Sequence, residues 1–545
     1  MINEIEKLAE GQFKNYLQTV FLDRSKSICE TVKMNKIEFF KKTPRKDKRE
    51  ALQKKSLDIL TNIFITAQQR NLNEVNELLK YEIDHPPPAL IKPKTGDIKS
   101  GTKSKLIDCL LKMPMTTNPQ NTSNEFMDTG LKMLIRDASV MIRFNRPKRS
   151  CKTFSDYVHI LVGIIEADFN NYGRIDIVFD RYFELSIKSV TRSDRTESRP
   201  GIRYSVKAQT PLPPDWEDFL SNSDNKRELN EFVAEEMINR IKISSGKTLI
   251  TTINEGILKL PYESTSGYDS LQPCNHEEAD SRMFLHALNG SNNGFKNIMI
   301  KSNDTDVVVI AMTLFNRLDL ETLDVSFGKG TGYQVVPVHT ICNTLGAEKC
   351  SSFLLFHSLT GCDSTTSLLN IGKPTAWNKW LVSTESVFSA LKALTVNLEE
   401  NANHAATTEK FISSMYWAEA STMDDARIAL FLHRGVPLMK LPMTSDTFKN
   451  KLKRSMYQAN AWTQSLVKAV SLPDPINWGF KIEDKNLVFD WGTLPDVLSK
   501  KWATFRKCGC KTDCSTNNRC SCHKATDNAA VELGCTTLCK CSCQD

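Results

Sequence analysis

The chain has 545 residues, more than a single hydrophobic core organises, so about two to four domains are expected. Hydrophobic residues make up 40% of the sequence, which excludes general disorder, and the net charge of +7 is compatible with a polyanionic partner without requiring one. The opening MINEIEKLAE is too polar for a secretory signal, and apolar runs such as VVVIAM (307–312) are far shorter than a membrane span. We therefore expect a soluble, intracellular protein.

The first 125 residues are expected to lie outside the main folded domain. Residues 1–84 are predicted to be helical, with a strongly basic run at 39–55. That run is interpreted as a solvated helix face, with nuclear import or nucleic-acid contact as the alternative. Residues 85–125 are predicted to be a linker, because three consecutive prolines and the Gly, Ser and Lys that follow disfavour a packed helix.

From residue 126 to 400 the sequence alternates between strand and helix patterns. RIDIVFD (174–180) and FKNIMIKS (295–302) are typical of buried parallel strands, and the runs that flank GKGTG (328–332) predict a hairpin. The alternation predicts an α/β domain with a mostly parallel sheet and with its site at the carboxyl ends of the strands. A long, largely helical insertion is expected at 184–260, and a helical region at 401–505.

Carboxylates recur beside the short apolar runs of this domain. They are Asp137, Asp180, Glu278, Asp280, Asp304, Asp306 and Asp363. Carboxylates at the edge of an apolar core are costly, and several in one pocket repel each other unless a cation neutralises them. Hard oxygen ligands in this number suit Mg²⁺ or Mn²⁺, which are typical of phosphodiester chemistry.

Local spacing gives each acid an expected position. Asp304 and Asp306 are two residues apart in what is interpreted as the end of an extended run, so both side chains are expected on one face. Glu278 and Asp280 are expected at the entry to a helix. Each acid taken singly also has a structural interpretation, such as a helix cap at Asp280, a turn at Asp363 or a solvated surface acid at Asp137.

The order of these motifs resembles the flap endonuclease family, the XPG-type branch of the PIN-like nucleases. The family's Asp-Ala-Ser, Phe-Asp, Glu-Ala-Glu, Asp-x-Asp and Gly-x-Asp correspond to residues 137–139, 179–180, 278–280, 304–306 and 361–363 of this chain. One position departs from the family, because Asp280 stands where the family has Glu. The resemblance spans residues 130–385 and implies a PIN-like three-layer α/β/α fold.

The resemblance also implies an activity, the hydrolysis of DNA or RNA phosphodiesters by two Mg²⁺ or Mn²⁺ ions. Asp137 would be catalytic, and the implied metal ligands are Asp180, Glu278, Asp280, Asp304, Asp306 and Asp363. Lys188 and Arg195 are seven residues apart, could share a helix face, and would bind the scissile phosphate; an ordinary solvated face is their alternative. A second hypothesis is a catalytically inactive nucleic-acid-binding or protein-docking protein, derived from a mobile element.

The last 38 residues contain nine cysteines: Cys508, Cys510, Cys514, Cys520, Cys522, Cys535, Cys539, Cys541 and Cys543. With bridging, nine thiolates suffice for about three tetrahedral zinc ions, whereas a disulfide-rich or disordered tail is the alternative. The pattern resembles the CXC module of tesmin-type proteins, which implies that residues 506–545 help to bind DNA. Arg519 stands where that module has a Tyr, so its base preference does not carry over. Together these features predict a nuclear protein, or otherwise a cytoplasmic one.

Overall fold

The computed structural model describes residues 79–82, 85–92, 97–114, 132–181, 202–262, 267–398, 401–483 and 486–492, with a few isolated positions before them. The chain divides into two units, Met1–Thr61 and Asn62–Asp545, and the elements below belong to the second. Lys188, Arg195, the nine tail cysteines and most of residues 1–84 lie outside the described residues. None of the helices described is both long and apolar enough to cross a membrane.

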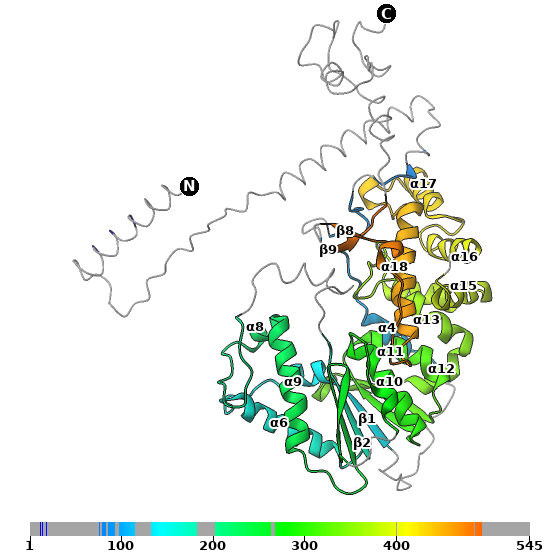
Figure 1. Cartoon of the computed structure of the whole chain (residues 1–545). Coiled ribbons are helices and arrows are strands. Elements are labelled where there is room, and N and C mark those ends of the chain that lie inside the picture. Colours follow the sequence, from blue (N-terminus) through cyan, green and yellow to red (C-terminus); the bar gives the residue numbers. More distant parts are fainter. Residues whose placement is uncertain are drawn as a thin grey trace, which may run out of the picture. The chain divides into compact units, whose positions relative to one another are not determined.

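A mixed sheet of seven strands forms the centre of this unit (Figure 1). The strand order is β4-β3-β2-β1-β5-β6-β7. The strands are β1 (Lys132–Asp137), β2 (Arg174–Val178), β3 (Thr248–Ile253), β4 (Gly256–Leu260), β5 (Asn297–Lys301), β6 (Thr322–Phe327) and β7 (Gln334–Pro337). The five inner strands run parallel, and β4 and β7 are antiparallel at the edges. The predicted α/β class with a mostly parallel sheet is confirmed, as is the β6–β7 hairpin.

Helices cover both faces of the sheet, and side chains of β1 alternate between two cores. Leu134 belongs to the core shared with α5 (Ala138–Phe144), α6 (Phe154–Asp168), α8 (Trp216–Ser221) and α9 (Ser223–Arg240). Met133 and Ile135 point the other way, into the core shared with α10 (Ala279–Asn292), α11 (Thr305–Leu314), α12 (Val338–Leu345) and α13 (Ala347–Leu359). Figure 1 shows α6 and α9 on one side of the strands and α10 and α12 on the other. The domain therefore has three layers, α/β/α.

The second core continues into the C-terminal helices. These are α14 (Lys373–Leu381), α15 (Glu385–Val396), α16 (Ala402–Ser413), α17 (Met423–Arg434) and α18 (Ser445–Thr463), followed by the hairpin of β8 (Phe480–Glu483) and β9 (Asn486–Phe489). Helix α13 packs against both α15 and α18. The helices predicted for 401–505 thus extend the core of the sheet domain, and the hairpin was not predicted.

Two strands of the central sheet lie within the stretch predicted to be a largely helical insertion. Helices α8 and α9 fit that prediction, but β3 joins the sheet beside β2, and β4 pairs with β3. The sequence TLITTI (248–253) is β-branched and its four central residues are buried, as expected of an inner strand. The insertion predicted at 184–260 is therefore wrong in its last part.

The segment predicted to be a linker is also partly packed. Leu90 and Leu106 are fully buried, and α4 (Lys105–Leu111) packs against α14. The backbone carbonyl of Lys99 accepts a hydrogen bond from the amide of Ser367 at 2.8 Å. The prolines at 86–88 exclude a helix there, but they do not prevent the apolar side chains that follow from being buried. The structure corrects this part of the linker prediction.

Candidate metal centre

The candidate site lies at the carboxyl end of the sheet, where the strand order changes direction. From β1 the sheet continues to β2 on one side and to β5 on the other. Open α/β sheets place ligands at such a switch point. Asp137 is the last residue of β1, and Asp304 lies in the loop that follows β5.

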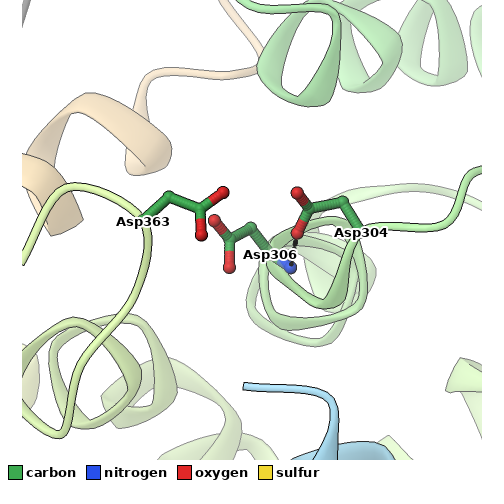
Figure 2. A group of neighbouring side chains, drawn as sticks. All are labelled: Asp304, Asp306 and Asp363. Atoms are coloured by element: carbon green, nitrogen blue, oxygen red, sulfur yellow. Dashed lines mark hydrogen bonds between the residues drawn. The ribbon is translucent and has the colours of Figure 1, made fainter. Parts of the chain in front are cut away.

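Three of the predicted acids converge here (Figure 2). Asp304 is the N-cap of α11, and its Oδ1 accepts a hydrogen bond from the Asp306 amide at 2.8 Å. Asp306 lies in the first turn of α11, and Asp363 reaches in from the loop after α13. One carboxylate oxygen from each of the three lies within 4.8 Å of the others. We call these residues the triad; its donor set fits Mg²⁺ or Mn²⁺, which prefer hard oxygen ligands.

The backbone at Asp304 and Asp306 differs from the prediction. The residues after Asp304 form a helix rather than continuing a strand, so the two side chains meet at a helix N-terminus. Residues 306–312 are all buried. A helix buried on every side shows no polar face, which is why its sequence resembles that of an inner strand.

A tight turn presents Asp363 to the triad. Gly361 has φ +107°, and a Cβ there would lie 2.8 Å from the Cα of Ser367, so only glycine fits. Cys362 points inward, and its amide donates to Thr365 Oγ1 at 3.2 Å. The next side chain, Asp363, is 43% exposed and faces the other two acids.

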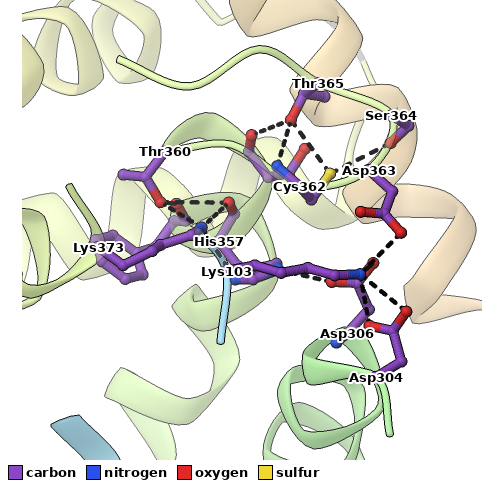
Figure 3. Close-up of polar contacts among 12 residues, drawn as sticks. Lys103, Asp304, Asp306, His357, Thr360, Cys362, Asp363, Ser364, Thr365 and Lys373 are labelled. Atoms are coloured by element: carbon purple, nitrogen blue, oxygen red, sulfur yellow. Dashed lines mark hydrogen bonds and ion pairs between the residues drawn. The ribbon is translucent and has the colours of Figure 1, made fainter. Parts of the chain in front are cut away.

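Lys103, which is not among the predicted site residues, lies between the three carboxylates (Figure 3). Its Nζ is 2.6 Å from Asp304 Oδ1, 3.2 Å from Asp306 Oδ2 and 2.9 Å from Asp363 Oδ2. Burial alone would lower the pKa of Lys103, but the three carboxylates outweigh it and raise that pKa above the ordinary lysine value. The ammonium therefore stays charged. Burial, with the charge of Asp306, raises the pKa of Asp304 to about 6.

His357 supports Asp306 from the protein interior. Its Nε2 lies 2.9 Å from Asp306 Oδ1, and its Nδ1 lies 3.1 Å from Nζ of the buried Lys373. Lys373 also donates to the His357 carbonyl and to Thr360 Oγ1. Burial lowers the pKa of His357 to about 4, so the neutral ring donates from Nε2 and accepts at Nδ1. A partner of this kind fixes the orientation of a carboxylate ligand.

Asp137 and Asp180 form a second group beside the triad. Asp180 accepts hydrogen bonds from Ser139 Oγ and from the Ala279 amide, both at 2.9 Å. The Oγ of Ser302 donates to Asp137 at 3.1 Å and lies 3.2 Å from the amide nitrogen of Asp304, so it links the two groups. Because Ala279 starts α10, its bond to Asp180 also brings the start of that helix to this group.

Glu278 and Asp280 lie where the sequence predicted, at the entry to a helix. Glu278 is the N-cap residue of α10, and Asp280 lies buried in its first turn. Neither belongs to the triad, which is the cation-compatible group among the residues that the structure describes. Of the seven predicted acids, three form the triad, Asp137 and Asp180 form the second group, and Glu278 and Asp280 lie at the start of α10, whose Ala279 amide contacts Asp180.

Asp137 is expected to make stability depend on pH. Burial, reinforced by Asp180, raises its pKa to about 7, against about 3.9 in the unfolded chain. The folded state therefore holds a proton that the unfolded state releases, and stability should fall as the pH rises from about 4 to about 7. With EDTA present, the melting temperature of Asp137→Asn should rise relative to that of the wild type as the pH increases over this range. Parallel curves for the two proteins would contradict the assignment.

No protein-family model matches the chain, and no curated protein matches it either. The solved structures that are similar to it include the two that follow. One is a pseudo-enzyme–product complex of the bacteriophage T5 D15 flap endonuclease with DNA and metal ions, with 11% identity, coverage of 61% of this chain and 99% of that one, and a TM-score of 0.29. The other is the catalytic core of Rad2 with a DNA substrate, with 16% identity, coverage of 59% and 92%, and a TM-score of 0.25. TM-scores this low leave the function to be inferred from the site itself.

Proposed function

We propose that this protein is a metal-dependent nuclease that hydrolyses phosphodiester bonds of DNA or RNA. The observation that carries the proposal is the convergence of Asp304, Asp306 and Asp363 at the switch point of a mostly parallel sheet. Three carboxylates at this spacing need a cation, and their oxygens suit Mg²⁺ or Mn²⁺. The order of acidic motifs that resembles the flap endonucleases supports the same reaction.

In this proposal the triad holds divalent metal, and His357 keeps Asp306 in its binding orientation. The chemistry that divalent metal would supply there is activation of a water molecule and stabilisation of the leaving oxygen of the phosphodiester. Asp180, Glu278 and Asp280 would complete a two-metal site, and Asp137 would be catalytic. Lys188 and Arg195 are proposed to bind the scissile phosphate and to offset its developing negative charge.

A cleavage assay tests this function directly. Flap, hairpin and single-stranded DNA and RNA are incubated with the full chain in Mg²⁺, in Mn²⁺ and in EDTA. Cleavage of at least one substrate is expected with metal and none with EDTA. If no substrate is cut with metal above the level of a triad variant, the protein is not a nuclease.

A second candidate function is favoured by Lys103, whose ammonium lies among the acids that metal would need. In that case the domain is a catalytically inactive nucleic-acid-binding or protein-docking scaffold, of mobile-element origin. The two functions give different results in one experiment. An inactive nucleic-acid-binding scaffold would bind labelled oligonucleotide equally with metal and with EDTA, a protein-docking scaffold would not bind it, and both would leave it uncut.

The cysteine-rich tail is proposed to be a zinc module that aids DNA binding in a nuclear protein. Its nine thiolates suffice for about three zinc ions. The purified chain is expected to contain about three zinc ions by elemental analysis, and a variant that lacks residues 506–545 is expected to contain almost none. Equal zinc content in the two proteins would contradict the assignment.

A further inference from the structure

Lys103 is a cation at the site that the proposed reaction does not use. It lies 201 residues before Asp304 and 260 before Asp363, yet its ammonium contacts all three triad carboxylates (Figure 3). We propose that Lys103 is an internal cation that competes with divalent metal for the triad and thereby sets the metal affinity of the site. The inference rests on the proposed function, because it takes the triad to be the metal-binding group.

The lysine and a metal ion would need the same oxygens. Nζ lies 2.6 Å from Asp304 Oδ1, 3.2 Å from Asp306 Oδ2 and 2.9 Å from Asp363 Oδ2. A Mg²⁺ ion would contact such oxygens at about 2.0–2.1 Å, inside the space that the ammonium takes. A metal ion and an ammonium that contact the same oxygens would also repel each other strongly. Metal can therefore enter only when the ammonium leaves.

The backbone that carries Lys103 is fixed on the domain. Both the amide and the hydroxyl of Ser367 donate to the Lys99 carbonyl, at 2.8 and 3.0 Å. On the other side, the Lys103 carbonyl accepts from the amide of Leu106, whose side chain is fully buried. Withdrawal of Lys103 therefore requires only rotation of its own flexible side chain.

Because of this anchorage, the competition is intramolecular. A tethered group competes at an effective concentration far above that of a free amine in solution, so its effect on metal binding is large. The other lysines of the segment do not share this position. Lys99 donates to the backbone carbonyls of Pro88 and Ala89, and Lys105 is 60% exposed and pairs with Asp108.

Metal binding is the test, with Mn²⁺ as the probe and calorimetry as the measurement on the full-length, zinc-loaded chain. Lys103→Met keeps the length of the side chain and removes its charge. This variant is expected to bind Mn²⁺ at least about tenfold more tightly than the wild type. Lys105→Met is the matched control, with the same change two residues away, and should bind like the wild type.

Thermal unfolding of the same variants is measured in parallel and shows whether each of them is folded. Without metal, Lys103→Met leaves the triad without its cation, so its melting temperature should rise more on Mn²⁺ addition than that of the wild type. Lys103→Gln, which keeps polar contacts but no charge, serves if the Met variant does not fold. Unchanged or weaker Mn²⁺ binding by both neutral variants would overturn the proposal.

Asp363→Asn in the same series separates this proposal from the proposed function. If Asp363→Asn loses Mn²⁺ binding while Lys103→Met binds Mn²⁺ no more tightly than the wild type, the triad is a metal site but Lys103 does not compete with the metal. If Mn²⁺ binds to Lys103→Met but not to the wild type, the competition stands and a metal-dependent reaction of the wild type fails. Absence of Mn²⁺ binding from every variant overturns the metal site and, with it, the competition.

Discussion

Replacing Asp304 and Asp306 together with asparagine is expected to reduce metal-dependent cleavage at least about a thousandfold, or by about 4 kcal/mol of transition-state stabilisation. The two substitutions remove two of the three negative charges that face one another in the triad. Asparagine is nearly isosteric with aspartate, and its carbonyl oxygen still accepts the amide hydrogen bond that caps α11. The loss should therefore come from metal binding rather than from unfolding.

A matched double variant controls for the change in charge. Asp108 and Asp319 have exposed side chains that pair with lysines on the surface, and neither belongs to the triad. Asp108→Asn/Asp319→Asn should cut substrate at the wild-type rate, measured on the same oligonucleotide in Mg²⁺ and Mn²⁺. Wild-type cleavage by the triad variant would assign the activity to another site or to a contaminant.

Several strands and helices could be predicted because each has a distinctive pattern of apolar residues within its own sequence. The strands at RIDIV (174–178) and NIMIK (297–301) are short apolar runs, and both are inner strands of the sheet. Two β-branched runs around GKGTG form the hairpin of β6 and β7. The helix after Glu278 follows from apolar residues at helical spacing.

Two segments were predicted wrongly because their residue patterns are compatible with both a strand and a helix. TLITTI (248–253) carries a strand pattern, but it follows a long helix in a charged stretch, and the long-range pairing with β2 decides its state. The run after Asp304 has the opposite problem, because its β-branched residues favour a strand while the N-cap at Asp304 and burial on all sides support a helix. Tertiary context overrides propensity in both segments.

The acids of the site could be proposed from the sequence, whereas the cation among them could not. Each aspartate of the triad lies beside a recognisable apolar run. Lys103 lies in a stretch rich in Gly, Ser and Lys that looks like an ordinary linker, and the packing of α4 together with the Ser367–Lys99 hydrogen bonds brings it to the triad. His357 likewise sits within an apolar helix and carries no sign of its contact with Asp306.

Asp176 stabilises the domain through a buried network on β2. Both oxygens of its carboxylate accept from Arg174, at 2.8 and 2.7 Å, and one also lies 2.6 Å from His286 Nδ1. Arg174, Asp176 and His286 are each 0% exposed, and Arg174 donates further to Asn289 of α10. Burial alone would raise the pKa of Asp176, but Arg174 outweighs it and the pKa is lowered. The carboxylate is therefore charged at neutral pH.

Replacing Asp176 with asparagine should lower the free energy of unfolding by about 3–5 kcal/mol at neutral pH, because the positive charge of Arg174 stays buried without its partner. That is a large part of the stability of an ordinary domain, about 5–15 kcal/mol in total. Urea unfolding measures the change. Arg174→Met/Asp176→Leu removes both charges, so it should cost less than the two single variants added together. Additive losses would show that the two side chains contribute independently and that the pair does not act as one buried unit.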